Sequence, residues 1–143
     1  MKCNVDVVFH DRNHITSFVC CVRDSHGQFI RAQTKWRRTN MTVLGGGEAV
    51  ALLEAIHFAD VNIWNRVVFE SDSSTLVQAL SSPSHGDSEF YAIVSSIIYQ
   101  LSLHSNFEVK FVRRQANMVA LTLARAACSW ASHRIFLFSS FLY

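Results

Sequence analysis

Proline, glycine and charged residues are all scarce in this sequence. The 143 residues include one proline and five glycines, and only 17% are charged, whereas 50% are hydrophobic. Disordered segments show the opposite balance, with few apolar residues and a high net charge. The sequence therefore predicts a folded globular chain, long enough for one domain whose core needs neither disulfides nor a structural metal.

Long apolar runs are also missing. No stretch approaches the roughly 18 apolar residues that a membrane span requires, and Asp6 interrupts the N-terminus before the apolar core of a signal peptide could form. The apolar C-terminal stretch IFLFSSFLY is short and contains two serines. We expect an intracellular protein, in the nucleus or the cytoplasm, with no membrane partner.

Neither net charge nor cysteine spacing identifies a function. A formal net charge of +2 is too small to indicate a nucleic-acid partner by itself. The four cysteines form no CxxC pair and no Cys/His pattern with zinc spacing. We interpret them as reduced thiols in the core or at the surface.

Hydrophobic periodicity and turn residues predict three consecutive strands, followed by helices that alternate with two more strands. The strands are expected at 4–9, 15–22, 28–36, 66–70 and 107–113, and the helices at 48–59, 74–81, 89–103 and 117–127. Short links make the first three strands antiparallel, whereas parallel neighbours need helical crossovers. The predicted fold class is α/β, a mixed sheet with helices on both faces. Residues 1–131 form the expected domain, and the apolar tail, 132–143, has no assigned structure.

Three acidic residues stand where elements begin, end or are interrupted. Asp6 interrupts the first strand, Glu48 opens the first helix, and Asp72 follows the fourth strand. Each has a purely structural alternative: Asp6 as a surface-facing strand residue, Glu48 as a complement to the helix dipole, and Asp72 as a helix N-cap. Taken singly, none of the three proves a site.

Two further acids are expected to be solvated. Glu54 lies about 120° around the helix from Glu48, so the two cannot easily share a focus. Glu70 points to the opposite side of its strand from Ser71. Both are interpreted as surface residues.

Asp6, Glu48 and Asp72 would repel one another if they converged without a neutralising cation. Magnesium is the natural cation, because it is a hard ion that prefers oxygen ligands and a substrate phosphate can complete its shell. Two such ions about 4 Å apart can hold both the attacking water and the leaving oxygen of phosphodiester hydrolysis.

Several segments together resemble the ribonuclease H type 1 family, in particular the reverse-transcriptase-derived ribonuclease H-like domains abundant in plant genomes. The resemblance covers nearly the whole chain and is carried, in order, by KCNVDVVF, CVRDSHGQFI, EAVALLEAI, VVFESDSSTLVQAL and FVRRQANMVALTLARAA. It implies a five-stranded mixed sheet in the order 3-2-1-4-5, dependence on Mg²⁺ or Mn²⁺, and endonucleolytic cutting of the RNA strand of RNA-DNA hybrids.

The resemblance assigns Asp6, Glu48 and Asp72 as catalytic metal ligands. Relatives carry a fourth acid, or a histidine, in a pattern like R-x-x-N-x-x-A-D/H-x-L-A, where this chain has Leu121. An alkyl side chain cannot coordinate a metal, so this fourth position is degenerate. Val7, where relatives more often have a small residue, is a second departure, and a branched side chain there is expected to crowd the site.

Substrate contacts are expected from Gly46, Gly47, Ser73, Arg114 and Asn117. The glycines have two alternative roles that the sequence does not separate: their backbone N–H groups could approach a 2′-OH of the hybrid closely, or they could form a flexible loop at the start of the helix. Two basic groups could contact phosphates or be ordinary solvated residues; they comprise Lys35, Arg37 and Arg38, and Lys110, Arg113 and Arg114.

Three functional hypotheses follow. The leading one is a metal-dependent ribonuclease H. The alternative is a catalytically weak or inactive nucleic-acid-binding remnant of a retroelement, motivated by Leu121 and by the glycines at 45–47, which replace polar groove residues of the family. The basic protrusion of the family is not evident either, so weak substrate binding, or binding supplied by an additional domain or protein partner, is expected. The third is a protein-interaction module that uses the apolar tail.

Overall fold

The computed structural model describes residues 1–10, 14–38, 44–82, 86, 88–127 and 134–137. Six strands and four α-helices are found in this part of the chain. The strands are β1 (Lys2–His10), β2 (Ile15–Arg23), β3 (Phe29–Arg38), β4 (Val67–Ser71), β5 (Phe107–Phe111) and β6 (Arg134–Leu137). The helices are α1 (Leu44–Val61), α2 (Ser74–Ser81), α3 (Glu89–Leu103) and α4 (Met118–Ala127), with a 3₁₀ turn, η2 (Arg114–Asn117), before α4.

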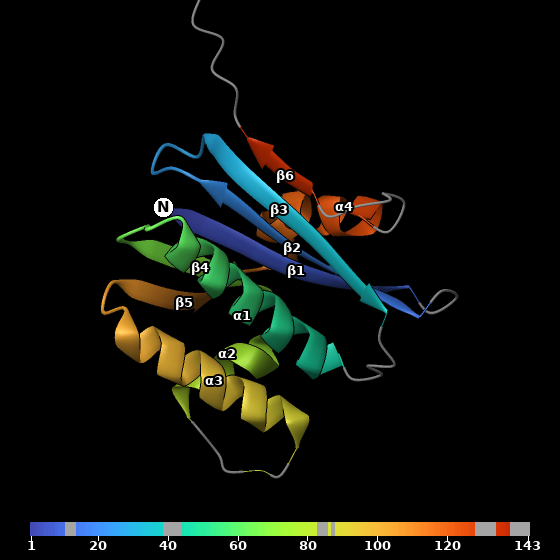
Figure 1. Cartoon of the computed structure of the whole chain (residues 1–143), viewed down its shortest axis with the longest axis vertical. Coiled ribbons are helices and arrows are strands. Elements are labelled where there is room, and N and C mark those ends of the chain that lie inside the picture. The colour runs from blue at the N-terminus through green and yellow to red at the C-terminus, as the bar shows by residue number, and fades with distance from the viewer. Residues whose placement is uncertain (11–13, 39–43, 83–85, 87, 128–133, 138–143) are drawn as a thin grey trace, which may run out of the picture.

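The strands form one mixed sheet in the order β5-β4-β1-β2-β3-β6 (Figure 1). β1, β2 and β3 are antiparallel neighbours, whereas β4 pairs in parallel with both β1 and β5. The predicted order 3-2-1-4-5 is therefore confirmed for the first five strands. A short sixth strand, β6, extends the sheet beside β3 and falls in the segment that had no assigned structure.

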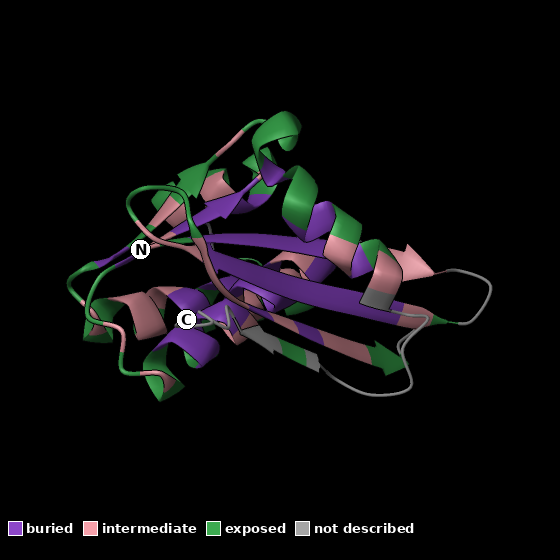
Figure 2. Cartoon of the chain, turned by 90° about the horizontal axis from the view of Figure 1, so that it is seen from above, coloured by how far each residue is buried: buried purple, intermediate pink, exposed green. Residues whose placement is uncertain are grey.

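Helices cover both faces of the sheet, as predicted. α1 packs on β1 and β2 with α3 beside it, and α4 packs on β1 and β2 from the other face (Figure 1). In the view of Figure 2 the central strands are buried along most of their length, while the helices show both buried and exposed residues. The core therefore lies in two layers, one on each side of the sheet.

β1 alternates between these two layers because successive strand residues point to opposite faces. Cys3 and Val5 pack in the larger core cluster with residues of α1 and α3. Asn4 and Asp6, which alternate with them along the strand, are also buried, so this part of β1 is enclosed on both sides. Its central position in the sheet explains why a strand containing an aspartate is buried from Cys3 to Val7.

α1 begins at Leu44, four residues before the predicted start at Glu48. The glycine run is therefore part of the first helical turns rather than a loop. Gly47 is buried, and a Cβ atom there would overlap the ring of Phe9. The glycine lets β1 and α1 approach closely at this point, a packing role that the helical periodicity of the following residues does not reveal.

Other predicted boundaries shift by a few residues. β5 ends at Phe111 rather than at residue 113, and α4 begins at Met118 after the η2 turn. The chain from Val112 to Asn117 leaves the sheet early, which brings Arg114 to the end of β4, as described below.

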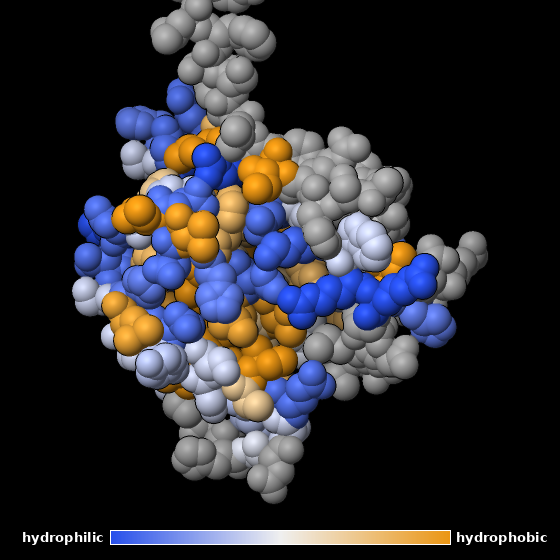
Figure 3. All heavy atoms as spheres, viewed as in Figure 1, coloured by the Kyte–Doolittle hydropathy of each residue, from blue (hydrophilic) through white to orange (hydrophobic). Residues whose placement is uncertain are grey.

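Surface composition differs across the molecule. On the face seen in Figure 3, a band of strongly hydrophilic side chains lies over the C-terminal half of β3, next to apolar side chains around α1 and α3. None of the described helices has the length and apolar character needed to cross a membrane. Cys3, Cys20 and Cys21 are free and buried, which agrees with the interpretation as reduced thiols.

Candidate metal centre

The three predicted acids converge. Asp6, Glu48 and Asp72 each offer one carboxylate oxygen, and these oxygens all lie within 4.8 Å of one another. The residues come from β1, from α1 and from the connection between β4 and α2, so sequence separations of 24 residues or more are closed by the fold. Such a cluster could hold a metal ion.

Strand register places two of these acids side by side. β1 and β4 run parallel, and the last pair that they form is Asn4 with Glu70. Asp6 and Asp72 stand two residues further along their chains, where β1 continues and β4 ends. They therefore lie at the carboxyl end of β4, where α/β sheets commonly build their sites.

Ser73, not Asp72, is the N-cap of α2. The Ser73 hydroxyl accepts a hydrogen bond from the backbone N–H of Leu76 at 3.3 Å, and the residue has the extended backbone typical of a cap. The Ser71 hydroxyl in turn accepts a bond from the Ser73 N–H at 3.2 Å. The alternative that Asp72 caps the helix is wrong, and its carboxylate remains available to the cluster.

Glu48 lies beyond the first turn of α1. Because the helix begins at Leu44, its first turn contains no acidic residue. The helix dipole acts mainly within the first turn, so dipole complementation does not explain an acid at this position. The glutamate instead faces the two aspartates.

Asp6 is the most buried acid of the cluster. It is 1% exposed, which rules out the alternative of a surface-facing strand residue. Burial raises the pKa of Asp6 from its ordinary value to about 6, and the negative charge of Asp72 adds to this effect. The Val7 N–H donates to Asp6 Oδ1 at 2.7 Å and, with the charges of Arg114 and Arg125, opposes the rise.

Glu48 shows a larger perturbation. Burial raises the pKa of its carboxyl group to about 8, with further contributions from the charges of Asp6 and Asp72, and Arg114 lowers it only in part. At neutral pH the cluster without a cation therefore retains a proton on Glu48. This proton removes part of the negative charge of the three carboxylates, which the nearby Arg114 compensates only in part.

The cluster also contains carboxylate oxygens without partners. Among the described residues, neither Asp6 Oδ2 nor Glu48 Oε2, both buried, accepts a hydrogen bond. Buried polar atoms are normally satisfied, because desolvation without a partner costs free energy. A donor set made only of carboxylate oxygens fits a hard divalent cation such as Mg²⁺ or Mn²⁺ and does not match the sulfur and nitrogen ligands of structural zinc.

Arg114 reaches the rim of the cluster. Its Nε lies 3.5 Å from Asp72 Oδ2, and its side chain is 66% exposed, compared with 11% for Asp72. Asn117, at the end of the same η2 turn, is fully buried, and its amide donates to the Val5 carbonyl at 2.8 Å. Of these two expected substrate contacts, Arg114 is accessible, whereas Asn117 holds the turn against β1.

The remaining expected contacts differ in accessibility. Gly46 faces open space, since a Cβ atom there would meet nothing within 4 Å, while Gly47 is covered by Phe9. The Ser73 side chain is engaged in capping. Leu121, where the resemblance led us to expect a fourth acid or a histidine, is 4% exposed, and Val7 packs with Val50 and Ala51 of α1 in a small core cluster.

Glu70 is buried, so the prediction that its side chain is solvated is wrong. It is 5% exposed, forms ion pairs with Arg23 at 2.7 Å and Lys2 at 3.3 Å, and accepts a hydrogen bond from the Asn4 amide at 3.0 Å. The prediction of a solvated side chain failed because strand alternation gives the face of a residue but not what covers that face. The partners come from β1 and β2, and only the register of the sheet brings them together.

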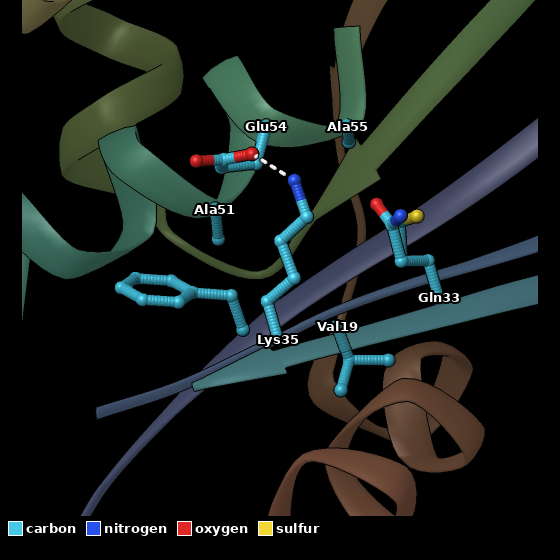
Figure 4. A pocket seen from close by; sticks show the side chains of 8 residues that line it. Val19, Gln33, Lys35, Ala51, Glu54 and Ala55 are labelled. Carbon is cyan, nitrogen blue, oxygen red and sulfur yellow. Dashed lines mark hydrogen bonds and ion pairs between the residues drawn. The ribbon is translucent and has the colours of Figure 1, made fainter. Parts of the chain in front are cut away.

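Glu54 is not simply solvated either. Its side chain, 19% exposed, bonds Lys35 Nζ at 2.6 Å and also pairs with Arg37. Figure 4 shows Lys35 reaching from β3 to Glu54 on α1, next to Ala51, while the Val19 side chain points away from α1. Two of the three basic residues expected to meet phosphates on β3 are therefore paired within the protein. Similarly, Lys110 pairs with Glu108.

The sequence matches one protein-family model. Residues 4–127 match the model described as reverse transcriptase-like, which covers most of the chain and includes all three acids. The chain belongs to the reverse transcriptase-like family. No curated protein matches the sequence.

Solved structures similar to this family member are ribonucleases H. The crystal structure of ribonuclease H1 from the halophilic archaeon Halobacterium salinarum NRC-1 matches 90% of the chain with 96% of its own length, at 16% identity and a TM-score of 0.69. LC11-RNase H1 in complex with an RNA/DNA hybrid covers the same shares at 13% identity and a TM-score of 0.76. The family member therefore has the ribonuclease H fold.

A viral polyprotein shows the same fold as one part of a larger chain. Prototype foamy virus protease-reverse transcriptase matches 92% of this chain at 13% identity and a TM-score of 0.65, but the match spans only 21% of the viral chain. The same fold thus occurs both in chains of similar length and as a module beside other domains.

Proposed function

We propose that this protein is a divalent-cation-dependent endonuclease that hydrolyses the RNA strand of RNA-DNA hybrids. The observation that carries the proposal is the convergence of Asp6, Glu48 and Asp72, whose oxygens lie within 4.8 Å of one another and include two buried oxygens without hydrogen-bond partners. The ribonuclease H fold and the neighbour bound to an RNA/DNA hybrid support the choice of substrate.

In this proposal the three carboxylates hold Mg²⁺ or Mn²⁺. When bound, the cation supplies positive charge that stabilises the charge developing on the scissile phosphate and makes water a better nucleophile at neutral pH. Asp6 is held rigidly by its bond from the Val7 N–H and by the enclosed strand around it. Asp72 is held at the end of β4 by the Ser71–Ser73 capping arrangement. The carboxylates thereby keep one geometry without a large ordering cost.

Other residues would then position the nucleic acid. Arg114 is exposed beside Asp72, where a guanidinium can contact a phosphate through two parallel hydrogen bonds. Gly46 leaves room for the close approach of a sugar-phosphate backbone and its 2′-OH. Asn117 contributes by fixing the turn that carries Arg114, since it is itself fully buried.

Cleavage of a hybrid labelled on its RNA strand tests the proposal. With Mg²⁺ or Mn²⁺ the wild type should cut the RNA, and Asp72→Asn should cut at least a hundredfold more slowly, a loss on the scale of removing one key electrostatic group from a site. Glu108→Gln makes the same chemical change at an exposed acid of β5 and should cut like the wild type. RNA duplex, DNA duplex and single strands should remain uncut. Equal cleavage by wild type and Asp72→Asn would refute the nuclease.

A second candidate is a nucleic-acid-binding protein without cleavage. It is favoured by Leu121, a buried alkyl side chain where the family pattern carries a fourth acid or a histidine. Fluorescence anisotropy with an uncleavable hybrid of 2′-O-methyl RNA and DNA measures binding separately from chemistry. Binding by a wild type that does not cut would select this candidate, whereas cutting would exclude it.

Two expectations belong with these proposals. Residues 1–131 form the functional unit in our proposal, with the β6 segment attached to the edge of its sheet. The expected protein-interaction role of the apolar tail, 132–143, falls largely on residues 132–133 and 138–143, outside the described part of the chain.

A further inference from the structure

The cluster of carboxylates has a protein cation at its rim. Arg114 places its guanidinium against Asp72, with Nε 3.5 Å from Oδ2. Asp72 is nearly buried, so this contact involves one of its few accessible sides. A divalent cation and this guanidinium would therefore meet at the same carboxylate.

The backbone that carries Arg114 is fixed to the strands that carry the acids. The Val112 N–H donates to the Ser71 carbonyl at 2.9 Å, directly before Asp72, and the Asn117 amide donates to the Val5 carbonyl at 2.8 Å, directly before Asp6. Within the turn, the Ala116 N–H donates to the Arg113 carbonyl at 2.8 Å. The Arg114 backbone is thus held at a set place relative to both aspartates.

The side chain of Arg114, in contrast, is not enclosed. It is 66% exposed, and among the described residues its ion-pair partner is Asp72. A long exposed side chain on an anchored backbone can exchange one partner for another at little cost, because an exposed ion pair contributes little net free energy. Its guanidinium can leave Asp72 and still remain within reach of a ligand at the cluster.

We propose that Arg114 is the counter-ion of the acidic cluster: it competes with the divalent cation for Asp72, and after displacement its guanidinium binds a phosphate of the nucleic acid. The proposal rests on the proposed function and adds a control of cation affinity to it. Its physical basis is charge. Three carboxylates and one guanidinium leave a net negative site, and removal of the guanidinium removes both a competitor and a repulsive charge.

Binding of Mn²⁺ to the free protein measures the first half of the proposal. Calorimetric titration at fixed ionic strength compares wild type, Arg114→Gln and Arg114→Lys, and the thermal unfolding of each variant verifies that it is folded. Arg114→Gln should bind Mn²⁺ about fivefold more tightly, the change expected when an exposed pair and its repulsion are removed. Arg114→Lys keeps the charge and should stay within about twofold of the wild type.

Arg113→Gln is the matched control, because it removes the same charge one residue away from an exposed side chain for which the described residues show no ion pair to the cluster. It should change Mn²⁺ affinity by less than about twofold, since screening weakens more distant exposed charges. An increase equal to that of Arg114→Gln would overturn the specific counter-ion role in favour of a general charge effect.

Binding of an uncleavable hybrid in the presence of Mg²⁺ measures the second half. Arg114→Gln should bind the hybrid more weakly than the wild type although it binds the cation more tightly. Equal Mn²⁺ affinity of wild type and Arg114→Gln would overturn the competition while leaving the metal site intact. Unchanged hybrid binding would remove the phosphate contact. If neither protein bound Mn²⁺, the metal site and the counter-ion would both be wrong.

Discussion

Glu70 and the acidic cluster of Asp6, Glu48 and Asp72 lie close together in the fold, but their carboxylates have opposite electrostatic surroundings. Glu70 on β4 is surrounded by Arg23, Lys2 and the Asn4 amide. Asp6 lies two residues beyond Asn4 on β1, and Asp72 lies two residues beyond Glu70, just after β4. Both aspartates lie close to Glu48, and Arg114 contacts Asp72 at the edge of this cluster.

The difference appears in the surroundings of the oxygens. Both oxygens of Glu70 have partners, Lys2 on one and Arg23 and Asn4 on the other. In the acidic cluster, Asp6 Oδ2 and Glu48 Oε2 are buried and accept no hydrogen bond among the described residues. Burial of a charge is tolerated when it is paired and satisfied. The charge of Glu70 is therefore compensated within the protein, whereas the cluster keeps uncompensated negative charge that a bound cation would neutralise.

The largest expected effect is on chemistry. Asp6→Asn should reduce hybrid cleavage by on the order of a hundredfold or more, because a group aimed at the reacting phosphate through the cation is lost. The same change should raise the free energy of unfolding measured without divalent cation, because it removes a buried charge that repels Asp72. Denaturant unfolding and initial cleavage rates are the two measurements. A fall in both would assign Asp6 a structural role like that of Glu70.

The acidic cluster should make the stability of the protein depend on pH. The pKa values of Asp6 and Glu48 are raised above their unfolded values, to about 6 and about 8. The folded state then binds these protons more tightly, so their stabilising contribution is complete below about pH 4 and is lost as pH rises through 6 and 8. Without divalent cation, the free energy of unfolding should fall by on the order of 3 kcal/mol between pH 6 and pH 9.

Glu48→Gln is the control for this dependence. It cannot ionise, so the part of the fall between pH 7 and pH 9 should disappear, and saturating Mg²⁺ should flatten the wild-type curve in the same range. Chemical denaturation at a series of pH values measures the effect. A wild-type curve that rises from pH 5 to pH 9 would contradict the raised pKa values.

Breaking the paired group should cost stability instead. Glu70→Gln leaves the Arg23 guanidinium beside a neutral amide in a largely buried place. We expect a loss of about 2 kcal/mol in the free energy of unfolding, less than for a fully buried pair because Arg23 and Lys2 are partly exposed. Glu108→Gln, at an exposed pair, should leave the free energy of unfolding nearly unchanged. Equal effects of the two variants would show that burial does not distinguish these acids.

The smallest expected effect concerns Leu121. Leu121→Asp introduces an acid where the proposed family pattern has its fourth acidic position, and it should raise metal-dependent cleavage severalfold in Mn²⁺. It also places a charge at a site that is 4% exposed, so stability without cation should fall, and added Mn²⁺ should recover part of it. Cleavage rates and thermal unfolding with and without Mn²⁺ test both parts. An unchanged rate in a folded variant would show that Leu121 does not limit the reaction.

The sequence predicted the convergence of the three acids better than it predicted their surroundings. The order of the strands and the choice of Asp6, Glu48 and Asp72 followed from element order together with a family pattern spread over most of the chain. The partners of Glu70 and Glu54 could not follow, because they depend on the register between β1, β2 and β4 and on the distance from β3 to α1. A shift of the strand register by one residue would turn the strand side chains to the other face of the sheet.

Helix starts were the other weak point. Asp72 and Ser73 are both good N-cap residues, and only the backbone shows that Ser73 is the cap. The glycines before Glu48 favour a loop by intrinsic propensity, yet close packing of Gly47 against Phe9 places them in α1. In both cases the sequence left local alternatives nearly equal, and the three-dimensional structure distinguishes them.

Calorimetric titration of Mg²⁺ or Mn²⁺ into the wild type near pH 7, repeated in buffers of different ionisation enthalpy, tests whether the acidic cluster binds a divalent cation. Because Glu48 retains a proton at this pH when no cation is bound, binding should release about one proton per site. Asp6→Asn should bind much more weakly, and Glu70→Gln, if folded, should bind like the wild type. The absence of binding, or binding that releases no proton and survives Asp6→Asn, would contradict the account.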